Sequence, residues 1–367
     1  MNSNFNLEKI FNMSIDQVDS ISQDMESNVY EMSVPKKDGS KRKIIAPCDK
    51  LKHIQKNIYY KIFMRYRPSK NAHGFVRKRG IVTNAKQHLD PKSFGHLDIR
   101  NFFDTISEDH IKQYVFGNKN ICRLCKNYEK MLDGECHPSM YQNKNKKFSH
   151  RCEELKAIFL PEYCEKTGYK SLYKYIIKLC TYKGHTVQGF TTSPVIANIV
   201  LNIFDKILNN FCTKRNITYT RYADDLAFSS KVHNKKALEK ILKEFVTSLI
   251  IDNNFEVNNK KTFWKSGKGY IKICGVVVDK NRICVPRYKV RHFRARVHYA
   301  TVKFKDETSK SKIRSLKGYA SYIMSVDPGK GNRYMSQLKN FESENKGSLK
   351  VDQEIEHDEH LDIVDVN

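Results

Sequence analysis

The chain has 367 residues, with 66 Lys and Arg against 40 Asp and Glu, and a formal net charge of +26. A basic excess of this size favours a polyanionic partner, with nucleic acid ahead of an anionic membrane surface. A mean hydropathy of −0.63 and the lack of any apolar run of about 18 residues argue against a membrane-spanning protein.

The N-terminal part is expected to alternate helical and basic segments. Residues 1–33 are predicted to form a helical lead-in. The first residues, Met1–Phe5, lack the basic and then apolar pattern of a signal peptide, which favours a cytoplasmic protein. The hydropathy given above disfavours a membrane as the partner. A basic strand carrying Arg42 comes next, followed by an amphipathic helix over Leu51–Arg67. A second basic turn includes Arg77. These charges suit either solvated loops or contacts with phosphates.

Asp98 lies on a short apolar strand, between Leu97 and Ile99, that runs into Phe102-Phe103. A single aspartate on a strand is usually a hydrogen-bonded structural residue. Asp98 becomes a candidate metal ligand because a two-metal site needs a further carboxylate from another part of the chain. Ser107 is predicted to cap the helix that follows.

Residues 117–170 are rich in Lys, Asn and Cys and have few periodic apolar positions. The first two cysteines have the C-x-x-C spacing of a zinc knuckle, which later Cys or His residues could complete. The candidate zinc ligands are Cys122, Cys125, Cys136, His137, His150 and Cys152. The alternative is a loop-rich insertion with free thiols, since ten cysteines in a reducing compartment do not favour disulfides.

A glycine-containing loop, Gln188-Gly189, leads into the next predicted helix. Ser193-Pro194 has the pattern of a helix cap followed by proline at the first helical position, and the apolar period continues to Phe211. Such transitions present backbone N–H groups to anions. Gln-Gly alone is a weak signal, but here it lies between Asp98 and the next acidic motif.

The most informative stretch is Thr218–Ser230. Strand-forming residues flank Asp224 and Asp225, which predicts a tight β-hairpin with both acids at its turn. Two neighbouring carboxylates repel each other unless a cation or a proton lies between them, and polymerases use such acids to bind Mg²⁺. Asp-Asp is also a common solvated turn. The flanking apolar strands and the basic composition favour the metal site.

The rest of the chain is predicted to be mainly helical. Asn234 should cap a helix through Ile250, and Lys261 follows in a polar stretch before a β segment. Residues 286–341 mix basic with aromatic side chains on helices, which suits either a solvated face or a cradle for a nucleic-acid duplex. Residues 342–367 turn acidic and lack periodicity, so we expect them to be disordered.

The order of these motifs resembles that of one family. From about Lys36 to Phe341 the chain resembles the reverse transcriptases, and most closely those of bacterial retrons and related defence-associated enzymes. Five sequence motifs that occur in the family's order identify the family more specifically than any single motif does. The motifs are Leu51-Lys52-x-Ile54-Gln55, His73-Gly74-Phe75 with Asn84-Ala85, Leu97-Asp98-Ile99-x-x-Phe102-Phe103, Gln188-Gly189-x-x-x-Ser193-Pro194, and Tyr222-Ala223-Asp224-Asp225.

The resemblance implies an α+β fold of the right-hand polymerase type, with an antiparallel palm sheet, a helical thumb and a Cys-rich insertion. Fingers are then expected over residues 34–93, the palm over 94–116 and 171–285, and the thumb over 286–341.

The resemblance also implies roles for single residues. Asp98 and Asp224 would ligate two Mg²⁺ ions, with Asp225 beside them as a further metal ligand, and Lys261 would protonate the leaving pyrophosphate. Phe103 would exclude the 2′-OH of a ribonucleotide. The residues implied to bind the nucleotide are Arg42, Arg77, Phe103, Gln188 and Gly189.

The implied function is RNA-directed DNA synthesis of the retron and anti-phage defence type. Single-stranded cDNA would be made from dNTPs on a cognate structured non-coding RNA, giving an RNA–DNA hybrid, with a toxin or nuclease as an effector partner. The alternatives are a defence-associated reverse transcriptase of another class, with unusual or no template use, and a catalytically silent RNA-binding scaffold. Many retron enzymes carry Val-Thr-Gly where this chain has Ile273-Cys274-Gly275, which leaves the cognate RNA and the mode of priming open.

Overall fold

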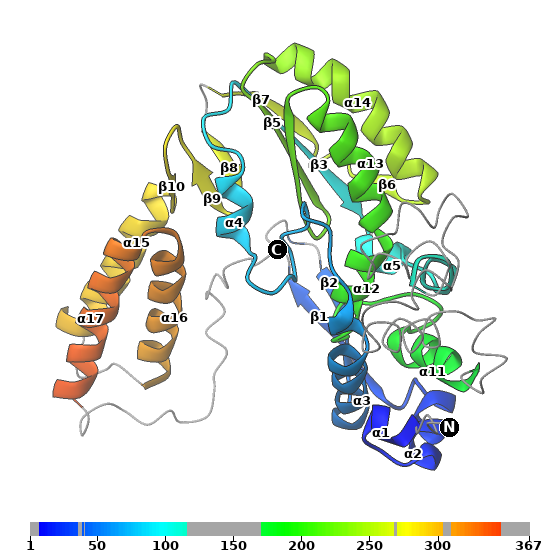
Figure 1. The fold of residues 1–367 in the computed structure, drawn as a ribbon. Coiled ribbons are helices and arrows are strands. Elements are labelled where there is room, and N and C mark those ends of the chain that lie inside the picture. Colours follow the sequence, from blue (N-terminus) through cyan, green and yellow to red (C-terminus); the bar gives the residue numbers. More distant parts are fainter. Residues whose placement is uncertain are drawn as a thin grey trace, which may run out of the picture. The chain divides into compact units, whose positions relative to one another are not determined.

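A computed structural model describes residues 7–35, 39, 41–115, 170–267, 270–303 and 310–345. The chain divides into two compact units, and each is described by itself. Unit 1 comprises Met1–Ala72, Ile99–Leu208 and Thr247–Val257, and unit 2 comprises His73–Asp98, Asn209–Val246 and Asn258–Asn367. Both units contain helices and strands (Figure 1), so the predicted α+β class is confirmed. The six candidate zinc ligands and the acidic tail from residue 346 lie outside the described residues.

Unit 1 is mainly helical, with one β-hairpin of β1 (Val29–Pro35) and β2 (Lys41–Pro47). Gln55 is fully buried on its helix. The Gln55 amide donates to the Leu179 carbonyl at 2.9 Å and accepts the Thr191 N–H at 3.2 Å, and so links three separate segments. The helices of unit 1 are α1 (Leu7–Phe11), α2 (Ile15–Gln23), α3 (Asp49–Lys61), η1 (Phe63–Arg65), α5 (Phe102–Thr105), α6 (Glu108–His110), η2 (Ile111–Val115), α11 (Lys170–Cys180) and α12 (Ser193–Val200).

The main sheet is antiparallel and is organised around β3 (Ser93–Arg100). Strand β5 (Asp225–Ser230) pairs with one edge of β3, and β4 (Ile217–Tyr222) pairs with the outer edge of β5. On the other edge of β3 lie β7 (Phe263–Ser266) and, at the Ile99–Arg100 end, β6 (Glu256–Val257). Two long helices flank the β4–β5 hairpin in the chain, α13 (Asn202–Thr213) before β4 and α14 (Lys235–Asp252) after β5.

In unit 2, a small sheet and the helices after it pack around one core, to which Ala85, Phe94 and Ala227 also contribute. Phe293, Leu316, Ile323 and Leu338 are buried in this core together with residues of the small sheet. The predicted helical region is confirmed over the described residues 287–303 and 310–341, with the apolar sides of its helices packed together. The elements are α4 (Ile81–Lys86), β8 (Ile271–Ile273), β9 (Val276–Val278), β10 (Ile283–Cys284), α15 (Arg287–His298), η5 (Tyr299–Lys303), α16 (Lys310–Val326) and α17 (Pro328–Glu344).

Several predicted boundaries differ from the structure. The helix predicted over Leu51–Arg67 spans Asp49–Lys61, and a separate short helix, η1, covers Phe63–Arg65. The helical lead-in ends before residue 29, because Val29–Pro35 pairs along its whole length with β2. Ser193 does not cap the next helix; it is the first helical residue, and its hydroxyl accepts the Val187 N–H at 3.3 Å. The helix predicted to continue to Phe211 is interrupted at Leu201, where α12 gives way to α13.

Two predicted helix caps are confirmed. The Ser107 hydroxyl accepts the backbone N–H of His110, and the Asn234 side-chain oxygen accepts that of Ala237 at 2.9 Å.

Within the part of the chain that the structure describes, no single helix is both long and apolar enough to cross a membrane. Helices α12 and α13 meet that test of length and composition only as a pair, bent by 48°.

The packing of Gly95 against Trp264 gives a first testable prediction. The two residues are partners across β3 and β7, and a Cβ at Gly95 would overlap the Trp264 indole. We therefore expect Gly95→Val to lower the free energy of unfolding by about 1–3 kcal/mol through overpacking. Urea denaturation followed by Trp264 fluorescence measures the change. Gly318→Ala on α16 is the control, because a Cβ there would meet nothing within 4 Å; equal midpoints for Gly95→Val and the parent protein would contradict the prediction.

A candidate metal-binding and catalytic site

The β4–β5 hairpin carries two of the candidate acids at its turn. Tyr222 pairs with Asp225 across the hairpin, which leaves Ala223 and Asp224 as the turn. Ala223 has φ of +54°, in the left-handed region that tight hairpin turns require. The predicted hairpin is confirmed, with Asp225 as the first residue of β5.

The register of the sheet brings Asp98 to these acids. Strands β3 and β5 pair antiparallel with Asp98 directly opposite Asp225. Side chains of directly opposed residues lie on the same face of a sheet and about 5 Å apart. One sheet face therefore presents Asp98 and Asp225 together, with Asp224 at the adjoining turn.

The electrostatics of this cluster show a deficit of positive charge. Burial, together with the negative charges of Asp225 and Asp98, raises the pKa of Asp224 to about 7. Burial also raises the pKa of Asp98, although the nearby ammonium of Lys261 opposes this shift. Each of the two shifts means that the ionised form is disfavoured by its surroundings, so a bound cation would be stabilised here.

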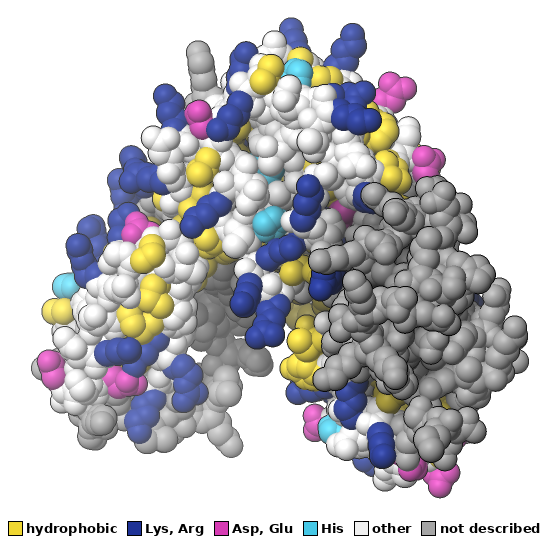
Figure 2. Space-filling view, in the orientation of Figure 1, with side chains coloured by type: hydrophobic (Ala, Val, Ile, Leu, Met, Phe, Trp, Pro, Cys, Tyr) yellow, Lys and Arg dark blue, Asp and Glu magenta, His cyan; other side chains and the backbone are white. Residues whose placement is uncertain are grey.

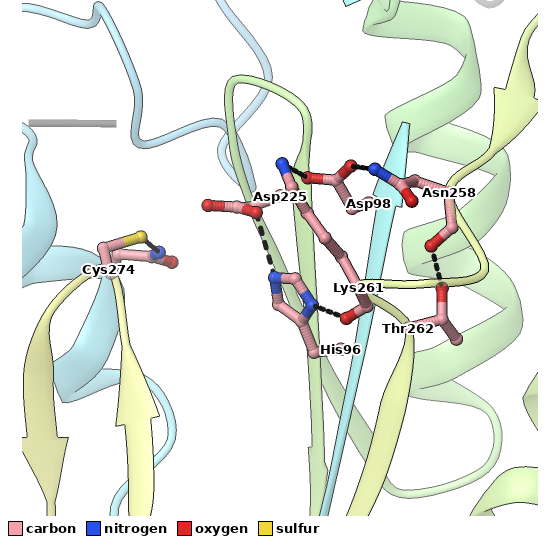
Figure 3. Close-up of polar contacts among 8 residues, drawn as sticks. His96, Asp98, Asp225, Asn258, Lys261, Thr262 and Cys274 are labelled. Carbon is pink, nitrogen blue, oxygen red and sulfur yellow. Dashed lines mark hydrogen bonds and ion pairs between the residues drawn. The ribbon is translucent and has the colours of Figure 1, made fainter. Parts of the chain in front are cut away.

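Asp98 is held by a turn that follows β6 (Figure 3). Its Oδ1 accepts the Asn258 side-chain amide at 2.8 Å, and its Oδ2 accepts Lys261 Nζ at 2.9 Å. The Asn258 backbone N–H also donates to the Asp98 carbonyl at 2.8 Å. The Asp98 side chain is 2% exposed, whereas that of Lys261 is 59% exposed. A buried carboxylate is therefore paired with a lysine side chain that lies largely in solvent.

His96 connects the same turn to Asp225. It lies two residues before Asp98, and its Nε2 is 2.9 Å from Asp225 Oδ1 while its Nδ1 is 3.1 Å from the Lys261 carbonyl (Figure 3). Both partners are acceptors, so an ionised Asp225 requires N–H on both ring nitrogens, which is the imidazolium form. Burial works to lower the pKa of His96, but the contacts with Asp225 and Lys261 outweigh it and raise the pKa.

A glycine loop packs against the back of the acidic turn. The His73 N–H donates to the Arg221 carbonyl at 2.7 Å, and a Cβ at Gly74 would lie 2.7 Å from the Ala223 nitrogen. The fully buried Arg221 guanidinium donates to the Ala223 carbonyl at 3.2 Å. The His73-Gly74-Phe75 block thus supports the turn that bears Asp224.

The remaining predicted residues are distributed over both units. Arg77 is exposed in a turn of unit 2. In unit 1, Arg42 lies on β2, and the Gln188 carbonyl accepts the N–H of Ile45 on the same strand at 2.8 Å. Gly189 has φ of +119°, and a Cβ there would overlap the Ile45 carbonyl. Unit 1 therefore joins the Gln188-Gly189 loop directly to the strand that carries Arg42.

Phe103 belongs to the same region of unit 1. It is half-buried on α5, and its carbonyl accepts the Thr186 hydroxyl at 2.6 Å, two residues before Gln188. Within unit 1 the structure thus connects three of the segments predicted to bind the nucleotide.

Two residues of the acidic site were not predicted from the sequence, His96 and Asn258. For His96 a signal was available, because residues i and i+2 of a strand share a face, which places His96 on the face of Asp98. Nothing local distinguishes Asn258 from its neighbour Asn259.

The donor set of the acidic site suits a hard divalent cation, since carboxylate oxygens are the ligands that Mg²⁺ prefers. Among the described residues, no three His, Cys, Asp or Glu side chains already surround a point where a metal ion could sit. Both oxygens of Asp98 accept hydrogen bonds, from Asn258 and from Lys261.

Comparisons with known proteins point to one family. Residues 147–278 match the model of the family described as reverse transcriptase (RNA-dependent DNA polymerase). The matched part includes Gln188-Gly189 and Asp224-Asp225 and begins after Asp98.

The curated relatives of this chain include proteins named as retron reverse transcriptases. The Retron Ec86 reverse transcriptase of Escherichia coli is 23% identical over 322 residues, which covers 87% of this chain and 82% of that protein. The Retron Mx162 reverse transcriptase of Myxococcus xanthus is 28% identical over 332 residues, covering 87% of this chain and 62% of that protein. A solved structure of apo telomerase from Candida tropicalis, at 12% identity and a TM-score of 0.41, is too distant to add to these matches.

Proposed function

We propose that this chain, which carries a reverse transcriptase domain and is an RNA-directed DNA polymerase, makes single-stranded cDNA on a structured non-coding RNA in the manner of retrons. The observation that carries the proposal is the register of β3 and β5, which sets Asp98 opposite Asp225 beside the Asp224 turn. The similarity to retron enzymes, at low identity but over most of the chain, supports a structured non-coding RNA as the template. We also propose that the protein acts in anti-phage defence and in the cytoplasm. Its effector partner would be a toxin or a nuclease.

Asp98, Asp224 and Asp225 would hold two Mg²⁺ ions. Such ions, when bound, activate the primer hydroxyl and neutralise charge on the triphosphate. The chain itself positions the ligands. Asn258 orients Asp98, His96 orients Asp225, and the hairpin turn fixes Asp224. Lys261 is the proposed donor of a proton to the leaving pyrophosphate.

The nucleotide would be bound by Arg42, Gln188, Gly189 and Phe103 of unit 1. For Arg77 the same role rests on the resemblance alone. The contact between the Gln188 carbonyl and β2 supports a shared surface for Gln188 and Arg42. Gly189 allows the loop to pack against β2, because a side chain there would be strained at φ of +119° and would overlap the Ile45 carbonyl.

An RNA–DNA duplex would be gripped by the helices α15–α17. Their apolar sides are buried in the core described above, which leaves basic side chains such as Arg287, Arg291 and Arg294 exposed. Figure 2 shows Lys and Arg side chains spread over the described surface, with fewer Asp and Glu side chains. Phosphate contacts of this kind do not depend on sequence.

The proposed role of Phe103 can be tested by nucleotide choice. We expect Phe103→Ala to raise incorporation of ribonucleotides relative to dNTPs by about 10- to 100-fold, because a side chain that excludes the 2′-OH has been removed. Single-nucleotide primer extension with matched dNTP and rNTP measures the ratio. Tyr60→Ala removes an exposed aromatic side chain of the same unit and serves as the control. An unchanged ratio in Phe103→Ala would remove Phe103 from this role.

The nucleic acid that copurifies with the protein tests the function as a whole. A covalent RNA–DNA product is expected from the retron mode. Repetitive DNA without a matching RNA would favour a defence-associated polymerase of another class. Tight RNA binding with no nucleotide incorporation under any divalent metal would identify a silent scaffold instead.

A further inference from the structure

Lys261 contacts the two acids of β3 and β5 by different routes. Its ammonium donates to Asp98 Oδ2 at 2.9 Å. Its backbone carbonyl lies 3.1 Å from His96 Nδ1, and the same imidazole contacts Asp225 through Nε2. One residue of the turn therefore reaches Asp98 with its side chain and Asp225 through its backbone and His96 (Figure 3).

The ammonium of Lys261 and a metal ion on the Asp98 carboxylate would repel each other. Each Asp98 oxygen accepts one hydrogen bond and keeps a lone pair that can ligate a metal ion. A divalent cation there would lie a few ångströms from the positive charge of Nζ and repel it. The repulsion favours the departure of one of the two. The Asp98 carboxylate is almost fully buried, whereas the Lys261 side chain is largely exposed and has solvent to move into.

The Lys261 backbone has its own support, which does not involve the ammonium. Its N–H donates to the Asn258 carbonyl at 3.1 Å, and its carbonyl faces His96. The side chain can therefore swing away while the turn and the His96–Asp225 contact stay in place.

We propose that Lys261 is a resident cation of the metal-free site, and that binding of Mg²⁺ displaces its ammonium from Asp98. This inference rests on the proposed function and adds a coupling between metal binding at Asp98 and proton donation by Lys261. While no metal is bound, Lys261 balances a buried carboxylate that would otherwise be unpaired. Once displaced, the ammonium is free to turn toward a bound triphosphate, so the proton donor becomes available only when the metal site is filled.

Binding of Mn²⁺, measured by electron paramagnetic resonance on the full-length protein, tests the proposal. We expect Lys261→Met to bind Mn²⁺ about 3- to 10-fold more tightly than the parent protein, because the competing charge is gone. DNA synthesis by the same variant should slow, since the proton donor is lost. Tighter metal binding with slower synthesis is a combination that a purely structural role of Lys261 does not produce.

Lys260→Met is the matched control, since Lys260 is the exposed neighbour in the same turn, and its Mn²⁺ affinity should equal that of the parent protein. Equal or weaker Mn²⁺ binding by Lys261→Met would overturn the inference and leave the metal site intact. If the parent protein binds Mn²⁺ no better than Asp98→Asn, the two-metal proposal falls as well.

A second measurement avoids substitution altogether. Acetylation of lysines by a soluble ester, followed by peptide mass spectrometry, reports how accessible each ammonium group is. Addition of Mg²⁺ should increase the labelling of Lys261 severalfold and leave Lys260 unchanged. Labelling of Lys261 that is indifferent to Mg²⁺ would contradict displacement.

Discussion

Asp224→Asn is expected to abolish DNA synthesis and, in the absence of metal, to raise the melting temperature of the protein. The loss of activity should be about 10³-fold or more, because a proposed ligand of the metal ions is removed. The gain in stability follows from the repulsion among Asp224, Asp225 and Asp98, which the uncharged amide relieves. Relief of about 1 kcal/mol corresponds to a rise of about 1–2 °C in the melting temperature of a chain of 367 residues.

The pH dependence of this gain has a defined sign. The pKa of Asp224 is raised to about 7 in the folded protein, whereas in the unfolded chain it titrates near 3.8. The folded state therefore holds this proton more tightly, and the Asp224 carboxyl lowers stability progressively as the pH rises from about 4 to about 7. The difference in melting temperature between Asp224→Asn and the parent protein should be small at pH 4.5 and largest above pH 7.

Thermal denaturation at several pH values, with EDTA and with Mg²⁺, measures both effects. Mg²⁺ should stabilise the parent protein and have little effect on Asp224→Asn. Normal incorporation by the variant would exclude Asp224 from catalysis. A parent protein that melts above Asp224→Asn in EDTA at pH 8 would show that the acids do not repel one another.

Gly74→Ala is expected to reduce the rate of DNA synthesis by about 10²-fold, although Gly74 is not one of the proposed ligands. A Cβ at Gly74 would lie 2.7 Å from the Ala223 nitrogen, and backbone atoms cannot rotate away as a side chain can. The turn that carries Asp224 must shift, and a misplacement of about 1 Å at a reacting centre costs a rate factor of this order.

Gly80→Ala provides the matched control for this prediction. Gly80 belongs to the same basic loop, its backbone is extended, and a Cβ there would meet nothing within 4 Å. It should synthesise DNA at the parent rate. Steady-state kinetics that separate kcat from KM should place the Gly74→Ala defect mainly in kcat. A Gly74→Ala enzyme as active as Gly80→Ala would mean that the loop does not set the position of the turn.

The sequence predicts those parts of the site that depend on local patterns or on the chemistry of metal ions. The β4–β5 hairpin was predictable because alternation and turn residues act over a few positions. Asp98 was identified by the need for another carboxylate, although its pairing with Asp225 is not local. Helix α12 shows the limit of local patterns, since Ser193-Pro194 looks like a cap and proline but Ser193 is used inside the helix, where its hydroxyl accepts the Val187 N–H.

The supporting contacts depend on the sheet register, so the sequence places His96 on the face of Asp98 but does not predict its contact with Asp225. His96 reaches Asp225 across 129 positions, and Lys261 reaches Asp98 across 163. Gly74 also has a role that composition does not reveal, since its importance comes from the approach of another backbone segment. In each case the residue type allows several uses, and only tertiary packing selects one.

The pairing of β3 with β5 also bears on how the protein folds. Strands that meet across so much intervening chain close a large loop, and contacts of this kind form slowly. A nascent chain that has not yet emerged past residue 261 lacks the Asn258 and Lys261 contacts that hold Asp98. In refolding with pulsed hydrogen exchange, the amides shared by β3 and β5 should gain protection after those of α16 and α17; earlier protection would show that the sheet nucleates folding.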